Sequence, residues 1–249
     1  MKANTFENTY CNPTPLPDYP VGRLCIAGEV HKYKYDYRET ADPSVIYEDG
    51  KWYLYPSCGM VYISEDFIHW EHKKMNPYDI GYAPTVVKHK GRFLLIACGS
   101  KIYASSSPIG PFTSLGALHD DSGQVYRLDD PMLFSDDDGR LYLYSGCGAE
   151  IRGCELDSND PTRLITENML MFGMNTVDHK WERMGEWNED SSYSWTEGSW
   201  MYKRGNTYYL TYSAPGTEWK TYGMGAYKSK SPLGPWEYMK TSPFLLTKS

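Results

Sequence analysis

Three acidic residues recur at the same point of a repeated sequence pattern. Asp42, Asp130 and Glu197 stand in the motifs Ala-Asp-Pro, Asp-Asp-Pro and Thr-Glu-Gly, and each motif precedes an apolar segment. A single Asp before Pro usually forms a turn, but the repetition predicts that the three side chains meet. Carboxyl groups that meet can divide acid and base work, because a protonated one donates a proton while an ionised one activates water. A third carboxylate supports this division by raising the pKa of its neighbour.

The elements that must position these motifs are hairpins, and the same hairpin is written four times. Each copy has an apolar strand, a turn ending in Gly, a polar residue and a second strand of aromatic and aliphatic residues. The turn and second strand occupy residues 49–55, 90–96, 138–144 and 204–210. Glycine supplies the positive φ that tight hairpin turns require. The repeat therefore predicts four β-hairpins in series.

Outer strands follow the hairpins, and two of them end in the related segments 107–112 and 231–236. Units of about four strands and roughly forty residues are typical of a β-propeller, whose first strands line a central channel. The chain is 15% aromatic and has 22 Gly and 16 Pro, which also favours an all-β fold over long helices. A sandwich of independent hairpins is the structural alternative.

We therefore expect residues 1–249 to form a single β-propeller domain with four legible blades. Between the third and fourth blades we expect an insertion, either a substrate-facing loop or a packed excursion. The predicted blades and the insertion are 41–75, 82–115, 129–157, 196–240 and 157–195.

Charge and composition narrow the class of partner. The net charge is −7 with no block of Lys or Arg, which argues against nucleic acid and anionic membranes. The 23 Tyr and 8 Trp suit sugars, which need flat apolar faces and hydrogen bonds. No apolar run is long enough to span a membrane and the N-terminus lacks a signal peptide, so a cytoplasmic protein is expected, or a secreted one if a signal was removed.

Cysteine and histidine show no metal-binding or catalytic spacing. The six Cys include no C-x-x-C pair and the six His do not stand at ligand spacing, so we predict free thiols and no protein-ligated metal. Cys58, Cys98 and Cys147 each follow the second strand of a hairpin. A small residue that recurs there indicates a crowded position near the common axis, where the thiol packs.

At the acidic motifs the chain resembles glycoside hydrolase family 43. The resemblance rests on Ala-Asp-Pro, Asp-Pro shortly ahead of Leu-Phe-Ser-Asp-Asp-Asp-Gly-Arg-Leu-Tyr-Leu, and Thr-Glu-Gly, and it covers residues 41 to about 238. It implies a five-bladed propeller and an inverting hydrolase in which Asp42 is the general base, Asp130 tunes the pKa and orients the acid, and Glu197 is the general acid. Asp129 is the competing choice for the role given to Asp130. Inversion requires the base and acid carboxyls to lie roughly 6.5 to 9.5 Å apart.

The resemblance also implies a substrate, a terminal xylose or arabinofuranose of plant cell-wall oligosaccharides. Relatives often carry Trp where this chain has Tyr82, so Tyr82 is expected to wall the sugar site, with Cys58 and Trp195 as further substrate-binding candidates. No cofactor is required, and a structural calcium in the central channel is a further expectation of the resemblance.

The fifth blade is the main departure from the family pattern. The Gly-His motif and sugar-contacting Arg of that blade have no visible counterpart before Ser249. Truncation, residues 1–40 or a second subunit would account for the gap, so the oligomeric state stays open. A non-catalytic sugar-binding propeller or an inactive fragment is therefore one alternative. Another five-bladed glycosidase acting on galactan or fructan is the second, although the fructan motifs Asn-Asp-Pro-Asn-Gly and Arg-Asp-Pro are absent.

Overall fold

The computed structural model describes residues 16–17, 40–57, 59–76 and 80–246, which fold into four antiparallel sheets. Each sheet is a meander in which consecutive strands pair. The first blade contains β1 (Ser44–Glu48), β2 (Lys51–Tyr55), β3 (Met60–Ser64) and β4 (Glu71–Lys74). The second contains β5 (Thr85–His89), β6 (Arg92–Ile96), β7 (Lys101–Ser105) and β8 (Thr113–Ala117).

The third and fourth blades follow the same plan. The third contains β9 (Met132–Ser135), β10 (Leu141–Ser145), β11 (Glu150–Leu156) and β12 (Met169–Gly173). The fourth contains β13 (Glu197–Arg204), β14 (Thr207–Ala214), β15 (Gly223–Ser229) and β16 (Glu237–Tyr238), and β17 (Leu245–Leu246) also pairs with β15. A 3-10 turn, η1 (Lys180–Glu182), is the helical element of the described residues.

The predicted hairpin turns connect the first two strands of the blades. In the first blade Asp49 and Gly50 have φ of 48° and 80°, and they separate the paired residues Glu48 and Lys51. Positive φ at both central residues defines the two-residue turn whose twist matches that of paired strands. The Gly in each repeat is therefore a backbone requirement of the hairpin.

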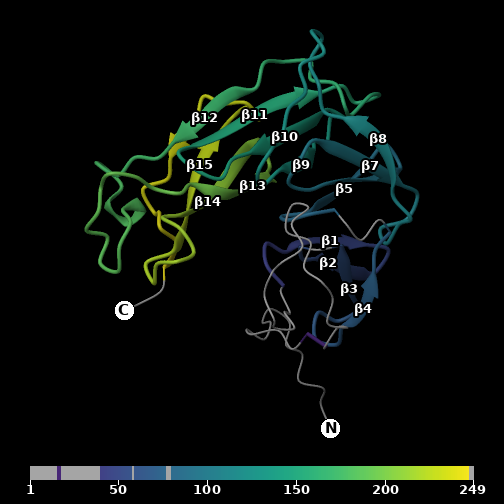
Figure 1. Cartoon of the computed structure of the whole chain (residues 1–249), viewed down its shortest axis with the longest axis horizontal. Coiled ribbons are helices and arrows are strands. Elements are labelled where there is room, and N and C mark those ends of the chain that lie inside the picture. Colours follow the sequence, from purple (N-terminus) through teal and green to yellow (C-terminus); the bar gives the residue numbers. More distant parts are fainter. Residues whose placement is uncertain (1–15, 18–39, 58, 77–79, 247–249) are drawn as a thin grey trace, which may run out of the picture.

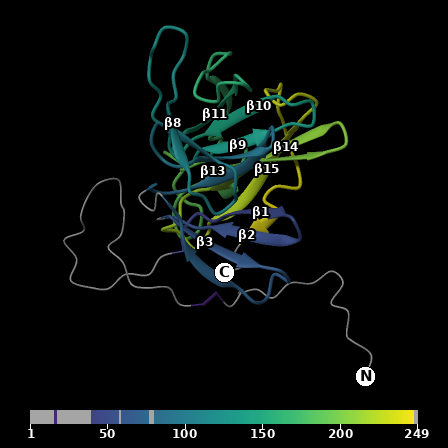
Figure 2. The same ribbon diagram turned by 90° about the vertical axis from the view of Figure 1, so that its right-hand side faces the viewer.

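The four sheets curve round a centre in sequence order, with β1, β5, β9 and β13 innermost (Figure 1). Neighbouring inner strands lie side by side, β1 with β5, β5 with β9 and β9 with β13. The view turned by 90° keeps the first blade and the third blade on opposite sides of the molecule (Figure 2). The all-β propeller with four blades, predicted from the repeat, is confirmed.

The hydrophobic core lies between successive blades. In β6, Leu95 belongs to the cluster shared with the first blade, whereas Leu94 belongs to the cluster shared with the third. In β10, Leu143 faces the second blade and Tyr144 faces the fourth. Because side chains alternate between the two faces of a strand, these central strands are buried on both sides and hold adjacent blades together.

One predicted boundary needs correction. Residues 169–173, which the sequence assigned to the insertion 157–195, form β12 and pair with β11 as the outermost strand of the third blade. This blade therefore extends past residue 157. The strand was missed because the loop that separates it from β11 is long and has no Gly turn of the kind that marks the repeated hairpins. The remainder, residues 174–195, joins the third blade to the fourth. The single-domain assignment stays a prediction.

Among the described residues, no helix has the length and apolar character needed to cross a membrane.

The inter-blade core yields a stability prediction. Leu133 is 1% exposed in β9 and packs in the cluster between the second and third blades. We expect Leu133→Ala to lower the free energy of unfolding by about 2–5 kcal/mol, because it removes buried methyl groups and leaves a cavity. The control is Leu170→Ala in β12 of the same blade, where the side chain is 51% exposed. Urea unfolding of both variants checks this, and equal losses would contradict the proposed position of the core.

Candidate active site

The three predicted acidic residues stand at the starts of inner strands. A single Pro separates Asp42 from β1, and another separates Asp130 from β9. Glu197 is the first residue of β13. The charges of Asp42 and Glu197 both raise the pKa of Asp130. Carboxylate oxygens of Asp130 and Glu197 lie within 4.8 Å of one another. The structure therefore brings together the three residues, which we call the carboxyl cluster.

An unusual backbone conformation repeats at the starts of the blades. Asp42, Ala83 and Asp130 have φ of 49°, 48° and 47°, and Gly198 has 60° in the fourth blade. Positive φ is uncommon outside glycine, although Asp tolerates it better than most residues. The position equivalent to Asp42 and Asp130 in the fourth blade is thus Gly198. Glu197 lies one residue earlier than the sequence motifs suggested.

Asp42 is held by a serine of its own blade. The Ser57 hydroxyl donates to Asp42 Oδ2 at 3.3 Å and accepts from the Ala83 backbone N–H at 3.1 Å. Surrounding protein atoms raise the pKa of Asp42, although its side chain reaches solvent, and the hydrogen bond from Ser57 partly offsets this rise. Because the Ala83 N–H occupies a lone pair of Ser57, the hydroxyl proton is available to stabilise ionised Asp42.

Asp130 is half-buried between the other two acids. Its Oδ2 accepts the Gly198 backbone N–H at 3.1 Å, and its own N–H donates to Cys98 Sγ at 3.3 Å. Burial, followed by the charge of Asp42, raises the pKa of Asp130 to about 6, against the lowering effect of the Gly198 N–H. A carboxyl group with this pKa is protonated in a substantial fraction of molecules near neutral pH.

Glu197 has a partner on each oxygen. The Tyr222 hydroxyl donates to Oε1 at 2.7 Å, and the Cys147 thiol donates to Oε2 at 3.3 Å. Cys147 is kept beside Glu197 by backbone pairing, since Thr196 N–H donates to the Gly148 carbonyl at 2.6 Å and Gly148 N–H donates to the Thr196 carbonyl at 3.2 Å. The fourth blade is therefore joined to the third immediately beside the carboxyl cluster.

Of the three predicted sugar-contacting residues, the structure describes Trp195 and Tyr82 but not Cys58. Trp195 is 38% exposed and lies two residues before Glu197, with the buried Thr196 between them. Alternation along an extended chain puts Trp195 and Glu197 on the same side. The Tyr193 ring meets Trp195 edge-on at 5.7 Å. Tyr82 is half-buried directly before Ala83, whereas Cys58 lies outside the described residues.

Sequence reasoning missed Ser57 and Tyr222, and gave Cys98 and Cys147 only a packing role. The three recurring Cys were a usable signal, but their alignment shifts by one residue. Ser57 N–H donates to the Ala41 carbonyl and Cys98 N–H to the Tyr82 carbonyl, so Cys98 is equivalent to Ser57. Tyr222 lies in an irregular loop with no repeat to mark it.

A group of possible metal ligands lies within the carboxyl cluster. Among the described residues, ligand atoms of Asp130, Cys147 and Glu197 all lie within 4.8 Å of one another. Calcium takes six to eight oxygen ligands, and a thiol is a soft donor that suits other metals. This donor set does not fit calcium, so the structural calcium stays a prediction without support from these residues.

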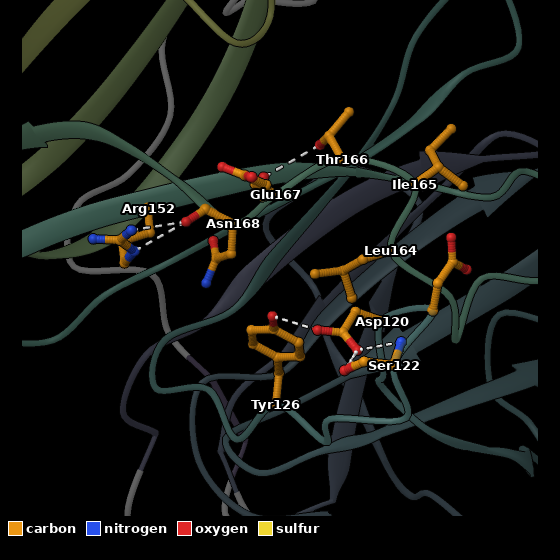
Figure 3. A pocket seen from close by; sticks show the side chains of 10 residues that line it. Asp120, Ser122, Tyr126, Arg152, Leu164, Ile165, Thr166, Glu167 and Asn168 are labelled. Carbon is orange, nitrogen blue, oxygen red and sulfur yellow. Dashed lines mark hydrogen bonds between the residues drawn. The ribbon is translucent and has the colours of Figure 1, made fainter.

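A separate hollow of about 600 Å³ lies on the outer part of the third blade (Figure 3). It is lined by the loop before β9 and the loop between β11 and β12, and includes none of the carboxyl cluster. Its polar groups already bind one another. Tyr126 and Ser122 hydroxyls donate to Asp120, and Arg152 donates to the Asn168 carbonyl. The carboxyl cluster is therefore the better candidate for chemistry.

Comparison with known proteins also points to glycoside hydrolases. The model of the glycosyl hydrolases family 43 matches residues 37–249. A β-D-galactofuranosidase of Aspergillus niger is 29% identical over 133 residues, which cover 53% of this chain and 33% of that protein. A xylosidase/arabinosidase of Butyrivibrio fibrisolvens is 28% identical over 147 residues, which cover 56% of this chain and 26% of that protein. The matches thus span about a third or less of these relatives.

The fold has solved counterparts. The crystal structure of a thermostable family-43 glycoside hydrolase superposes with a TM-score of 0.67 at 23% identity, covering 83% of this chain and 73% of that one. At this identity the likeness concerns the fold.

The raised pKa of Asp130 predicts how stability depends on pH. The pKa is about 6 in the folded protein and about 3.9 in an unfolded chain. Between these values folding takes up a proton, so the free energy of unfolding of the wild type falls as pH rises from about 4 to about 6. The amide introduced by Asp130→Asn cannot ionise. We therefore expect the free energy of unfolding of this variant to rise relative to that of the wild type over the same range, by about 3 kcal/mol once the pH is well above 6.

Urea unfolding at several pH values measures this difference. The control is Asp129→Asn, which removes a neighbouring exposed carboxylate and should leave a pH dependence close to that of the wild type. Parallel curves for the wild type and Asp130→Asn would contradict the assigned pKa.

Proposed function

The chain belongs to glycosyl hydrolase family 43, and we propose that it removes a terminal pentose, xylose or arabinofuranose, from plant cell-wall oligosaccharides by an inverting acid/base mechanism. The observation that carries the proposal is the carboxyl cluster, in which acids from three blades interact and one has a pKa raised to about 6. Glycoside hydrolysis needs such a set, with one carboxyl protonated and another ionised at the same pH.

In the proposed mechanism Asp42 is the general base and Glu197 the general acid. Asp42 takes a proton from the attacking water, and Ser57 favours the ionised state that this requires. Glu197 gives its proton to the oxygen of the leaving group as the glycosidic bond breaks. Each such proton transfer typically contributes 10²- to 10⁴-fold to the rate.

Asp130 is proposed to connect the two. The charge of Asp42 raises the pKa of Asp130, and Asp130 accepts a hydrogen bond from the backbone N–H of Gly198, the residue next to Glu197. Movement of Asp130 would therefore displace the backbone that carries the acid. This supports the role of orienting Glu197, and the proximity of three carboxyl groups supports the role of tuning pKa.

Trp195 and Tyr82 are proposed to contact the sugar. Trp195 offers an exposed ring on the side of Glu197, braced by Tyr193. The Tyr193 hydroxyl would lie 3.2 Å from a Cβ added at Gly148, next to Cys147, so this aromatic pair adjoins the carboxyl cluster. Cys58 remains a candidate for the same surface.

A second substrate class is galactofuranosides. The match to a β-D-galactofuranosidase favours including them, because that sugar also presents a five-membered ring. The carboxyl cluster would act in the same way on a pentose and on a galactofuranose. We therefore propose that the aromatic residues around the cluster determine which sugar is bound.

Replacement of the acid tests the reaction. We expect Glu197→Gln to lower kcat/KM on nitrophenyl β-xyloside, α-arabinofuranoside or β-galactofuranoside, whichever the wild type prefers, by about 10²- to 10⁴-fold. Asp129→Asn is the matched control and should stay within about threefold, because Asp129 is exposed and its charge is the last of the effects that raise the pKa of Asp130. Equal rates for Glu197→Gln and the wild type would remove Glu197 from the mechanism. NMR of the released sugar should show the anomer opposite to that of the substrate, and retention would exclude the inverting assignment.

The aromatic site predicts a change in binding. We expect Trp195→Ala to raise KM by about fivefold, because a ring that stacks on a sugar contributes on the order of 1 kcal/mol. The control is Trp187→Ala, in the same connecting segment, where the 70% exposed ring is covered by Lys220. Steady-state kinetics on an oligosaccharide measure both variants. An equal KM for Trp195→Ala and the wild type would exclude Trp195 from the sugar site.

A further inference from the structure

Two protein groups divide the oxygens of Glu197 between them. Tyr222, which directly precedes β15, holds Oε1, and Cys147, in the loop after β10, holds Oε2. The two contacts differ in strength, because a phenol is a strong donor at 2.7 Å and a thiol at 3.3 Å is a weak one. A protonated carboxyl group carries its hydrogen on one oxygen only, so this asymmetry bears on where the proton sits.

The Tyr222 hydroxyl is a permanent donor. Burial, and then the charge of Glu197 and the hydrogen bond to it, raise the pKa of Tyr222 well above its ordinary value, with a small opposing effect of a hydrogen bond with Ser213. The phenol therefore keeps its proton at any pH at which the protein would work. The 2.7 Å hydrogen bond directs the phenolic proton to Glu197 Oε1. A hydrogen on Oε1 would meet that proton head-on.

The Cys147 side can accommodate a proton. Desolvation by the surrounding protein atoms, followed by the charges of Asp130 and Glu197, raises the pKa of the Cys147 thiol although its side chain reaches solvent, so the sulfur stays protonated and does not act as a nucleophile. A thiol rotates freely and can accept as well as donate. Cys147 is solvent-exposed, so its side of Glu197 can be reached from outside, whereas Tyr222 is half-buried.

We propose that Tyr222 is a positioning residue that keeps the transferable proton of Glu197 on Oε2, so that the leaving group is protonated from the side of Cys147. This rests on the proposed function, in which Glu197 is the general acid. As the glycosidic C–O bond breaks, its electron pair moves to the leaving oxygen, which takes the proton from Oε2. Glu197 becomes a carboxylate, and the hydrogen bond from Tyr222 strengthens as the negative charge develops.

The test varies the need for the proton. Aryl glycosides of the preferred sugar would be compared, from phenyl, which leaves poorly without protonation, to dinitrophenyl, which needs little. We expect Tyr222→Phe to lower kcat on the phenyl glycoside by about 10- to 100-fold, the range of one hydrogen bond to a charged group. On the dinitrophenyl glycoside the loss should stay below about threefold, with KM within about twofold on both.

Two variants serve as controls. Tyr202→Phe removes an exposed hydroxyl from β13 of the same blade and should match the wild type on both substrates. Cys147→Ala removes the weaker contact, so its loss on the phenyl glycoside relative to the dinitrophenyl glycoside should be smaller than that of Tyr222→Phe. Thermal unfolding checks that each variant is folded. If Tyr222→Phe is not, Ser213→Ala, which frees the phenol to turn, should show the same selective loss to a smaller degree.

The outcomes separate the two proposals. A wild type that hydrolyses none of the glycosides overturns the proposed function and this inference with it. An active wild type whose Glu197→Gln variant is impaired, together with equal losses for Tyr222→Phe on both leaving groups or no loss at all, overturns the inference alone. A selective loss in Cys147→Ala but not in Tyr222→Phe would place the proton on Oε1 and also overturn it.

Discussion

The packing of each blade against the next is the constraint on which the site depends. The central strands β6 and β10 bury side chains on both faces, so neither can leave its neighbours without exposing an apolar surface. Burial of a Leu side chain stabilises a fold by about 1.5–3 kcal/mol, and many such residues act together. This apolar contact supplies the free energy that holds three carboxyl groups in one place, where their mutual repulsion and desolvation oppose folding.

The backbone at the blade starts turns this packing into a site. A left-handed residue begins every blade, and it aims the chain into the inner strand. In two blades the residue is an Asp, so its carboxyl group follows the turn. In the fourth blade Gly198 takes the left-handed position and the acid moves to Glu197. Because the Gly198 N–H then points at Asp130 Oδ2, the shift joins the acid to its neighbour through the backbone.

The sequence predicted what repeats and missed what does not. The Gly turns repeat, so the hairpins, the propeller and the meeting of Asp42, Asp130 and Glu197 could be anticipated. The strand at 169–173 follows a long loop that lacks the repeated Gly turn, and Tyr222 lies in an irregular loop, so neither has a repeat to reveal it. The equivalence of Ser57 with Cys98 depends on backbone hydrogen bonds, which a side-chain pattern does not record.

That equivalence explains how two similar aspartates can differ. Ser57 donates to Asp42 at 3.3 Å and partly offsets the rise in its pKa, whereas Cys98 approaches Asp130 Oδ1 only to 3.9 Å. A thiol is a weak donor, so it offers Asp130 little of the stabilisation that a hydroxyl offers Asp42. The Ser57 hydroxyl therefore stabilises ionised Asp42, whereas burial and the charge of Asp42 raise the pKa of Asp130. A general base must be ionised, as this arrangement favours for Asp42. A raised pKa lets Asp130 stay protonated between that base and an acid at Glu197.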